Sequence, residues 1–212
     1  MTVELHAYRY SVYSWIARLV LAEKGVSYNY VEVNPFAADL PAGYREKHPF
    51  QRVPTLVHDD FVLYETTAIT RYIDEAFPGI GLQPSTSRDR AREAQIIATI
   101  DAYGYWPMVR QVFSHRVFRP RTGQPADETE IRSGVIASER VVGALEALAG
   151  DGLYLVADRL TLADLHLAPM MAYFAAAEEG SAILARHRKL SAWWNLMRSR
   201  PAFAATDPGP PG

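Results

Sequence analysis

The chain has 212 residues, 49% of them hydrophobic and 22% charged, and a formal net charge of −2 with a pI near 6.3. This length suits one large domain or two small ones, and the slightly acidic balance argues against a nucleic-acid-binding surface, which needs a basic patch. No apolar stretch approaches the roughly 18 residues that cross a bilayer, and the start of the chain lacks the features of a signal peptide. The absence of cysteine excludes disulfides and thiolate metal sites and fits a cytoplasmic protein.

The first 78 residues alternate between strand-like and helix-like patterns. Alternating apolar residues indicate strands, and apolar residues three or four positions apart indicate helices. The predicted elements are a strand over 3–8, a helix over 14–24, a strand over 28–33, a hairpin of strands over 55–57 and 61–63, and a helix over 65–77. This βαβ-ββα order is the one that an α/β thioredoxin-like domain requires.

The rest of the chain has helical patterns only, which predicts a second, all-α domain. A stretch rich in Pro, Gly and Ser over 79–87 is expected to be the linker. Helices are expected over 88–117, 128–149, 161–177, 180–187 and 189–199. We therefore place the first domain at 1–78, the second at 88–206, and a disordered tail at 207–212.

Pro54 is out of place in the strand-like run Arg52-Val53-Pro54-Thr55-Leu56. Proline has no N–H group to donate to a sheet, so it is confined to edges, strand starts and bulges. A cis Val53-Pro54 bond at the head of an edge strand is one solution, because cis X-Pro typically marks a tight turn. Such a turn leaves the Val53 backbone available to bind an extended peptide. The alternative is a proline that merely opens an edge strand.

Three segments in register resemble the cytosolic glutathione transferases, and the resemblance covers nearly the whole chain. Residues 48–56 (HPFQRVPTL) are similar to the family's N-P-F-G-Q-V-P-x-L segment. Residues 64–69 (YETTAI) resemble its x-E-S-x-A-I helix start, and residues 161–164 (TLAD) match the capping box of its second domain. The resemblance implies the two-domain architecture predicted above, with glutathione as co-substrate and a homodimer.

Ser11 is the residue that this resemblance places beside the glutathione sulfur. The sequence Ser14-Trp15-Ile16-Ala17-Arg18 resembles the S-W-R-V-R pattern of serine-type members (phi, theta and zeta), and this alignment puts Ser11 at the catalytic position. The resemblance is to bacterial-type members of the family. The thiolate is the nucleophile, and a free thiol with a pKa of about 8.5 is mostly protonated at neutral pH, so a hydroxyl donor is needed. We expect Ser14 to cap the following helix, and Tyr8 remains an alternative thiol activator.

The other glutathione contacts implied by the resemblance are Val53, Pro54, Glu65 and Thr66. Val53 would pair with the cysteinyl backbone of glutathione. Glu65 and Thr66 begin a predicted helix, where free N–H groups and the dipole bind a carboxylate. The Glu65 carboxylate would accept a hydrogen bond from the ammonium of the γ-glutamyl group. The Thr66 hydroxyl would donate a hydrogen bond to the carboxylate of the same γ-glutamyl group.

The chain departs from the family where the glycine carboxylate of glutathione is bound. Phi-like members carry a His-Lys pair at the positions occupied here by Asp39 and Leu40. An acid and an apolar residue cannot hold a carboxylate, so Arg52 is the best substitute, with Lys47 and His48 as weaker candidates.

The acceptor site is expected on the long helix that starts at residue 88. Tyr103, Trp106, Arg110 and Phe113 are spaced to share one face, although such a stripe also fits core or dimer interface. We assign Tyr10, Tyr103, Trp106 and Arg110 to this site. The resemblance also implies that Asp101 reaches the glutathione of a partner subunit.

Several other features are interpreted as structural. Thr161 and Asp164 form a capping-box pattern that starts the core helix of the second domain, and His166 on that helix is expected to be a satisfied core residue. No metal site, phosphate loop or dinucleotide fingerprint is found.

The sequence thus predicts a homodimeric glutathione transferase that activates glutathione for attack on a hydrophobic electrophile, in detoxification. One alternative is a glutathione-dependent isomerase or dehalogenase, with Arg110 or Arg18 steering a carboxylated substrate. The other is a non-enzymatic binding or regulatory protein on the same scaffold.

Overall fold

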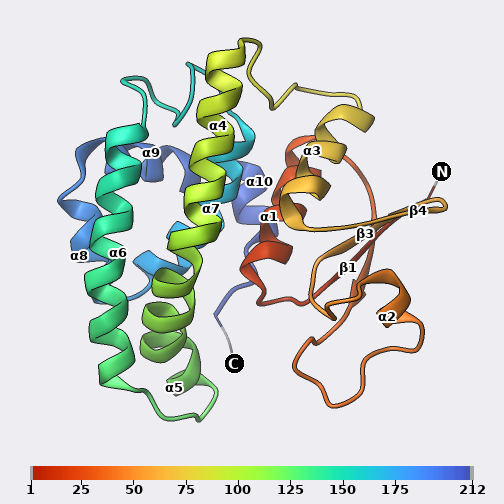
Figure 1. Cartoon of the computed structure of the whole chain (residues 1–212), viewed down its shortest axis with the longest axis horizontal. Helices are drawn as coiled ribbons and strands as arrows, with labels where there is room; N and C mark the ends of the chain where they lie inside the picture. Colours follow the sequence, from red (N-terminus) through yellow and green to blue (C-terminus); the bar gives the residue numbers. More distant parts are fainter. Residues whose placement is uncertain (1, 211–212) are drawn as a thin grey trace. The chain divides into compact units, whose positions relative to one another are not determined.

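The computed structural model describes residues 2–210, and these form two compact units (Figure 1). The first unit runs up to Gly81 and includes Ala205–Pro208. The second runs from Leu82 to Ala204 and includes Gly209 and Pro210. The first is a four-stranded mixed sheet with helices and the second is helical, so the predicted fold class is confirmed.

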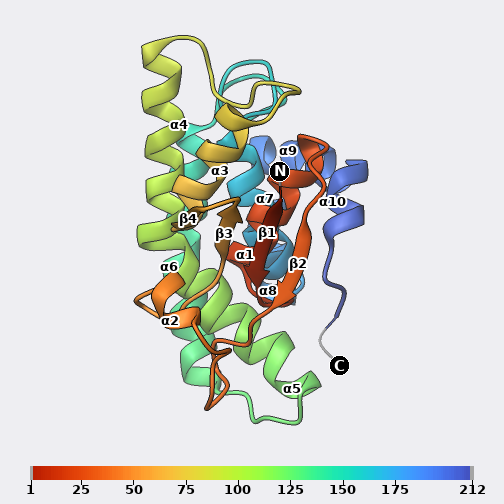
Figure 2. The same cartoon turned by 90° about the vertical axis from the view of Figure 1, so that its right-hand side faces the viewer.

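The first unit is built on a sheet with strand order β2-β1-β3-β4 (Figure 2). Strand β1 is parallel to β2, while β3 is antiparallel to both β1 and β4. The elements are β1 (Val3–Ala7), α1 (Val12–Glu23), β2 (Asn29–Glu32), α2 (Tyr44–Lys47), β3 (Thr55–His58), β4 (Phe61–Tyr64) and α3 (Thr66–Ala76). Each predicted element is present within two residues of its expected bounds, whereas α2 is too short to leave a periodic signal.

The core of the first unit lies where helices α1 and α3 contact each other. Alternate residues of β1 point to one face of the sheet, and apolar residues of the two helices recur at helical spacing. The fully buried residues of this core include Leu5, Ala7, Ile16, Leu19, Val20, Ile69 and Ile73. The opposite face of β1 carries His6, which is also buried.

The second unit is all-helical. Its elements are α4 (Ser87–Thr99), η1 (Ile100–Phe118), α5 (Arg119–Arg121), α6 (Glu128–Leu148), α7 (Leu162–Ala175), α8 (Glu178–Ala185), α9 (Arg188–Arg198) and α10 (Pro201–Thr206), the last of which ends in the first unit. Helix α10 is not among the helices expected from the sequence. Among the described residues no helix is long and apolar enough to cross a membrane.

Helix η1 differs from the prediction of one α-helix over 88–117. From Ile100 onward the backbone is wound as a π-helix, and the Arg119 N–H group at its end bonds to the Ser114 carbonyl five residues back. In this winding the bond closes one residue further along than in an α-helix. Residues at helical spacing therefore do not share a face, and nothing in the sequence predicts the change.

Helix α7 is the centre of the second unit and packs against η1, α4, α8 and α9 (Figure 1). Its residues are apolar and buried nearly all round, as expected for a core helix. The predicted capping box is confirmed, because the Asp164 carboxylate accepts from the Thr161 N–H group at 2.8 Å.

The same carboxylate holds three further donors. It accepts from the Thr161 hydroxyl and from the Leu155 N–H group, both at 2.8 Å, and from the Trp193 indole N–H group at 2.9 Å. Asp164 has no exposed surface. Burial raises the pKa of its carboxyl, and these hydrogen bonds oppose that shift. The cap thus joins the start of α7 to a loop and to α9.

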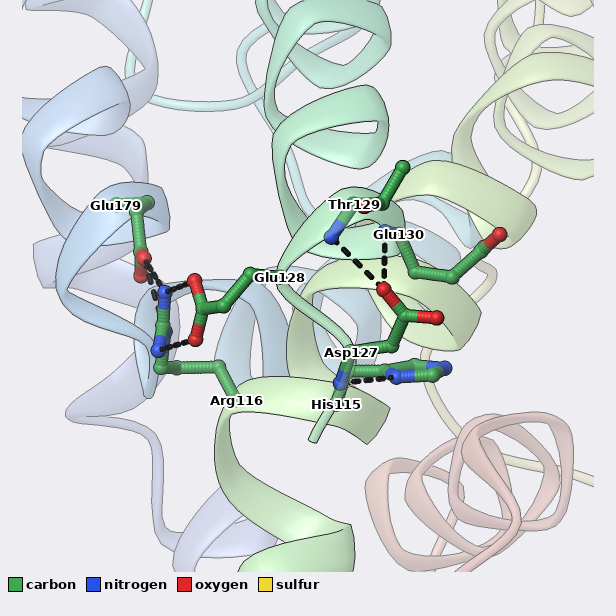
Figure 3. A network of polar contacts seen from close by, with 7 residues as sticks. All are labelled: His115, Arg116, Asp127, Glu128, Thr129, Glu130 and Glu179. Atoms are coloured by element: carbon green, nitrogen blue, oxygen red, sulfur yellow. Dashed lines mark hydrogen bonds and ion pairs between the residues drawn. The ribbon is translucent and has the colours of Figure 1, made fainter. Parts of the chain in front are cut away.

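A network of charges joins the end of η1 to the first turns of α6 and α8 (Figure 3). The Arg116 guanidinium binds both carboxylate oxygens of Glu128, at 2.8 and 2.9 Å, and Glu179 at 2.9 Å. Acidic side chains in the first turn of a helix also interact favourably with the helix dipole. Asp127 caps α6 by accepting from the Thr129 N–H group at 2.8 Å, which lowers the pKa of its carboxyl.

We expect Arg116→Met to lower the free energy of unfolding by about 1 kcal/mol, at the upper end for partly exposed pairs, because the geometry is bidentate and three helices share it. Arg186→Met, which removes a single exposed pair with Glu139 in the same unit, is the control and should cost less than half of that. Urea unfolding at low and high salt measures both. Equal costs would contradict the network's contribution.

The tail differs in part from the expectation of disorder over 207–212. The Pro208 side chain is buried, and its carbonyl accepts two hydrogen bonds from the Arg9 guanidinium. The tail is therefore bound to the first unit at this point. Residues 211 and 212 lie outside the described residues.

Candidate functional site

The three motifs singled out in the first unit gather at one end of its sheet. His6 of β1 lies opposite Thr55 of β3, and Thr55 lies opposite Tyr64 of β4. Since β3 is antiparallel to both neighbours, the end of β1, the start of β3 and the end of β4 lie at the same end of the sheet. The loop to Ser11, the Val53-Pro54 turn and the Glu65-Thr66 pair therefore lie together.

Two helices also begin at this end of the sheet. Helix α1 follows the end of β1 after a four-residue loop, and α3 follows β4 after the single residue Glu65. The first N–H groups of a helix have no partner within it, and the dipole adds partial positive charge there. The arrangement therefore favours an anionic ligand.

Ser11 is the N-cap of α1, and the prediction that Ser14 caps it is wrong. The Ser11 hydroxyl oxygen accepts from the Ser14 N–H group at 3.3 Å. The Ser14 side chain is fully buried and accepts from the Tyr8 N–H group at 3.3 Å. Because the Ser11 oxygen acts as acceptor in the cap, its own hydrogen remains to be donated elsewhere.

Tyr8, the alternative thiol activator, packs between two aromatic rings. Its ring centroid lies 5.9 Å from Tyr10 and 6.0 Å from Phe36, edge-on to both. Burial, followed by the charge of Glu32, raises the pKa of its phenol. Packing is thus a sufficient account of Tyr8.

The Val53-Pro54 bond is cis, as expected from the sequence. Tyr44 of α2 holds the turn in place, since its hydroxyl donates to the Arg52 carbonyl at 2.6 Å and contacts the Thr55 hydroxyl at 3.0 Å. Tyr44 is 2% exposed. The short helix α2 therefore anchors the segment that begins β3.

Glu65 has a strained backbone, with φ of 70° and ψ of 118°. A non-glycine residue in such a region costs about 1–3 kcal/mol, and such strain clusters at ligand-binding positions. The Glu65 side chain is exposed, and Thr66, the first residue of α3, is buried. This pair provides an acid and a hydroxyl at the start of a helix.

The three cations considered for the glycine carboxylate have different surroundings. Lys47 contacts His6, with its Nζ 3.1 Å from the imidazole Nε2. His48 is only 3% exposed, while Arg52 is exposed. Arg52 is therefore the most accessible of the three for an anion.

Buried His6 is expected to make the folded protein less stable in mild acid. Burial, and then the charge of Lys47, lowers the pKa of its imidazole below 6.5. The unfolded chain therefore takes up a proton at higher pH than the folded one, so the free energy of unfolding should fall as the pH drops below about 6.5. Urea unfolding at about pH 7.5 and about pH 5 should show a smaller fall for His6→Gln. The same fall in both proteins would contradict this origin.

The residues proposed in the second unit are not arranged as one stripe. Tyr103 and Trp106 are 67% and 58% exposed, whereas Phe113 is buried and stacks on Tyr173 with ring centroids 4.1 Å apart. The predicted shared face is wrong because η1 has π-helical winding. Arg110 is partly exposed.

Asp101 is paired within the second unit. Its carboxylate lies 2.8 Å from His166 Nε2, and His166 is 1% exposed. This contact gives the core histidine a partner at Nε2 and ties Asp101 to helix α7. In residues 2–210 no three His, Asp or Glu side chains are grouped so as to hold a metal ion.

Comparison with known proteins identifies both units. Residues 5–81 match the profile described as glutathione S-transferase, N-terminal domain, and residues 105–201 match glutathione S-transferase, C-terminal domain. The chain is 31% identical to glutathione S-transferase F13 of Arabidopsis thaliana, over 92% of this chain and 90% of that protein. The chain belongs to the glutathione S-transferase family.

Two further proteins are similar to this glutathione S-transferase family member, one in sequence and one in structure. A probable maleylacetoacetate isomerase of Caenorhabditis elegans is 31% identical, over 79% of this chain and 76% of that protein. The solved structure of glutathione S-transferase III in its apo form has a TM-score of 0.85 at 26% identity and covers 100% of this chain and 98% of its own.

Two sets of contacts at this end of the glutathione S-transferase sheet are not predicted from the sequence. One is Tyr44, which holds the Arg52 carbonyl. The other is Arg9, whose guanidinium binds Pro208, 199 residues away. Neither has a local signal in the sequence, because each partner becomes a neighbour only in the fold.

Proposed function

We propose that the protein is a glutathione transferase of the serine type, with glutathione as co-substrate. The observation that carries the proposal is the gathering of Ser11, the Val53-Pro54 turn and Glu65-Thr66 at the sheet end where α1 and α3 begin. This set offers a hydroxyl donor, an edge-strand backbone, an acid and two helix N-termini to one peptide-like thiol.

Ser11 acts by stabilising the thiolate of glutathione. Its oxygen accepts from the Ser14 N–H group, and its hydrogen would be donated to the thiolate. A hydrogen bond to a charged group is worth about 1.5–3 kcal/mol. The thiol proton leaves to solvent, and the sulfur electron pair then forms the bond to the electrophile as a leaving group departs or a double bond accepts the charge.

The remaining contacts hold glutathione in place. The Val53 backbone pairs with the cysteinyl residue, and Pro54 fixes the turn. Glu65 accepts from the γ-glutamyl ammonium, while Thr66 and the start of α3 bind the adjacent carboxylate. Arg52 binds the glycine carboxylate. Orientation of the thiol then supplies much of the rate.

The acceptor and the partner subunit are proposals of the same kind. Tyr10, Tyr103, Trp106 and Arg110 would contact a hydrophobic electrophile. Large exposed aromatic side chains outside this set favour a homodimer, and they include Phe50 and Phe61. Asp101 would reach the partner's glutathione with the carboxylate that also contacts His166.

We propose a cytoplasmic enzyme that detoxifies electrophiles, consistent with a chain that has no cysteine. A bacterial type gains no support from the relatives described above.

The second candidate is a glutathione-dependent isomerase, favoured by the similarity to the probable maleylacetoacetate isomerase. Arg110 or Arg18 would then steer a carboxylated substrate. An isomerase returns glutathione unchanged, whereas a transferase consumes the free thiol.

Calorimetric titration with glutathione and with S-methylglutathione, combined with thiol consumption in the presence of chlorodinitrobenzene, tests the proposal. We expect saturable binding of both ligands, thiolate absorbance with glutathione near neutral pH, and loss of free thiol with the aryl chloride. Thiolate formation without thiol loss for any electrophile tested would favour the isomerase. No binding at millimolar glutathione would leave a family member with another role.

A further inference from the structure

The loop that carries Ser11 is a tight turn. The Ser11 N–H group donates to the Tyr8 carbonyl at 3.0 Å, so Arg9 and Tyr10 occupy the two central positions. The position of the Ser11 hydroxyl therefore depends on the conformation of Arg9 and Tyr10.

Arg9 is held at three points. Its N–H group donates to the Glu32 carboxylate at 3.2 Å, and its carbonyl lies 3.4 Å from Nη2 of Arg18. Its guanidinium donates from Nε at 3.0 Å and from Nη2 at 2.8 Å to the carbonyl of Pro208. Two donors from one planar group fix the direction of the side chain as well as its distance.

A second contact ties the same C-terminal segment to helix α1. The Trp15 indole N–H group donates to the Thr206 hydroxyl at 3.0 Å in a buried hydrogen bond. Trp15 is 1% exposed and lies four residues after Ser11. Breaking this bond would remove a buried hydrogen bond, and such a bond contributes about 0.5–1.5 kcal/mol.

We propose that residues 206–208 position Ser11, with Arg9 and Trp15 as the residues through which they act. The two contacts lie two residues before Ser11 and four residues after it, so together they fix both sides of the turn. None of the residues involved needs to touch glutathione. The inference rests on the proposed role of Ser11 in stabilising the thiolate, since a displacement of about 1 Å at a reacting group can cost a hundredfold in rate.

The test replaces the Arg9 guanidinium and removes its partner, the Pro208 carbonyl, first separately and then together. Arg9→Lys keeps the charge and loses the two-donor fork, and Arg71→Lys, at an exposed arginine paired only with Glu75 in the described contacts, is its matched control. A chain shortened after Thr206 loses the Pro208 carbonyl, and one shortened after Pro210 keeps it. The readouts are the pKa of glutathione thiol in the bound state, kcat and KM, and amide hydrogen exchange over residues 9–15.

Arg9→Lys and the chain shortened after Thr206 should each raise the thiol pKa by about half a unit to one unit and lower kcat at neutral pH about three- to tenfold, with KM for glutathione changed less than about twofold. Exchange over 9–15 should become faster. In the chain shortened after Thr206, Arg9→Lys should have no further effect, because both changes remove the same contact. The Arg71→Lys variant and the chain ending at Pro210 should match the full protein.

Two different results distinguish failure of this inference from failure of the proposed function. Additive effects of Arg9→Lys and the shortening, or unchanged exchange and thiol pKa in Arg9→Lys while Ser11→Gly raises the thiol pKa, would overturn the positioning role. A thiol pKa that is unchanged in Ser11→Gly itself would overturn the proposed role of Ser11, whatever the exchange data show.

Discussion

Replacing Ser11 with glycine is expected to lower kcat/KM for glutathione conjugation at neutral pH about ten- to a hundredfold. The hydroxyl that we assign to the thiolate contributes about 1.5–3 kcal/mol when it bonds to a charged group. Its loss should raise the pKa of the bound thiol by about 1–2 units, because one unit corresponds to 1.36 kcal/mol. The deficit should therefore shrink as the pH rises and the thiol ionises without help.

Glycine is chosen because Ser11 also caps α1. Alanine at an N-cap costs about 1 kcal/mol, whereas glycine costs only a few tenths, so the folded protein is retained. Tyr8→Phe removes the rival hydroxyl and keeps the ring, and it should change kcat/KM less than about threefold, since its hydroxyl would matter only if Tyr8 were the activator. The assignment would be reversed if Tyr8→Phe raised the thiol pKa and Ser11→Gly did not.

Replacing Asp164 should cause the largest loss of stability. This carboxylate accepts four hydrogen bonds in a position with no exposed surface. Removing one partner of a buried hydrogen bond leaves the other unsatisfied, at about 1–3 kcal/mol each. We expect Asp164→Ala to lower the free energy of unfolding by about 3–5 kcal/mol, as for other buried networks that lose a charged member. Asp164→Asn, which turns one accepting oxygen into a donor, should cost about 2–3 kcal/mol.

The chain contains its own control for this prediction. Thr86 and Asp89 repeat the T-x-x-D pattern at the start of α4, where the Thr86 oxygen accepts from the Asp89 N–H group at 3.1 Å in an exposed position. Asp89→Asn should cost less than about 1 kcal/mol, since water replaces what the side chain loses. Urea unfolding followed by circular dichroism compares the two, and similar costs would show that burial adds nothing to the cap.

The sheet and most helices of this protein could be predicted because their signals are local. Alternation and helical spacing depend on residues that are near in sequence. The same is true of a proline in a strand-like run and of the Thr161–Asp164 capping pattern. The cap of α1 shows the limit of such reasoning. Ser11 and Ser14 are both good N-caps, and only the fold, which buries Ser14 beside the Tyr8 N–H group, decides between them.

The candidate site was predictable as residues and not as geometry. The resemblance selects Ser11, Glu65 and Thr66, but the sheet register brings them to one end. The winding of η1 has no periodic signal, so the expected face from Tyr103 to Phe113 fails. Contacts such as Arg9 with Pro208 cannot be predicted locally, because 199 residues separate the partners.

The inclusion of Ala205–Pro208 in the first unit has a consequence for the order in which the protein is made. On the ribosome the strands and helices up to Gly81 emerge first. Trp15 can bond to the Thr206 hydroxyl only after the 191 residues that separate the two positions have been added. Until then the unit holds a buried indole donor without this acceptor. The nascent first unit is therefore less stable than the finished one, and it matures only after the whole second unit has been synthesised.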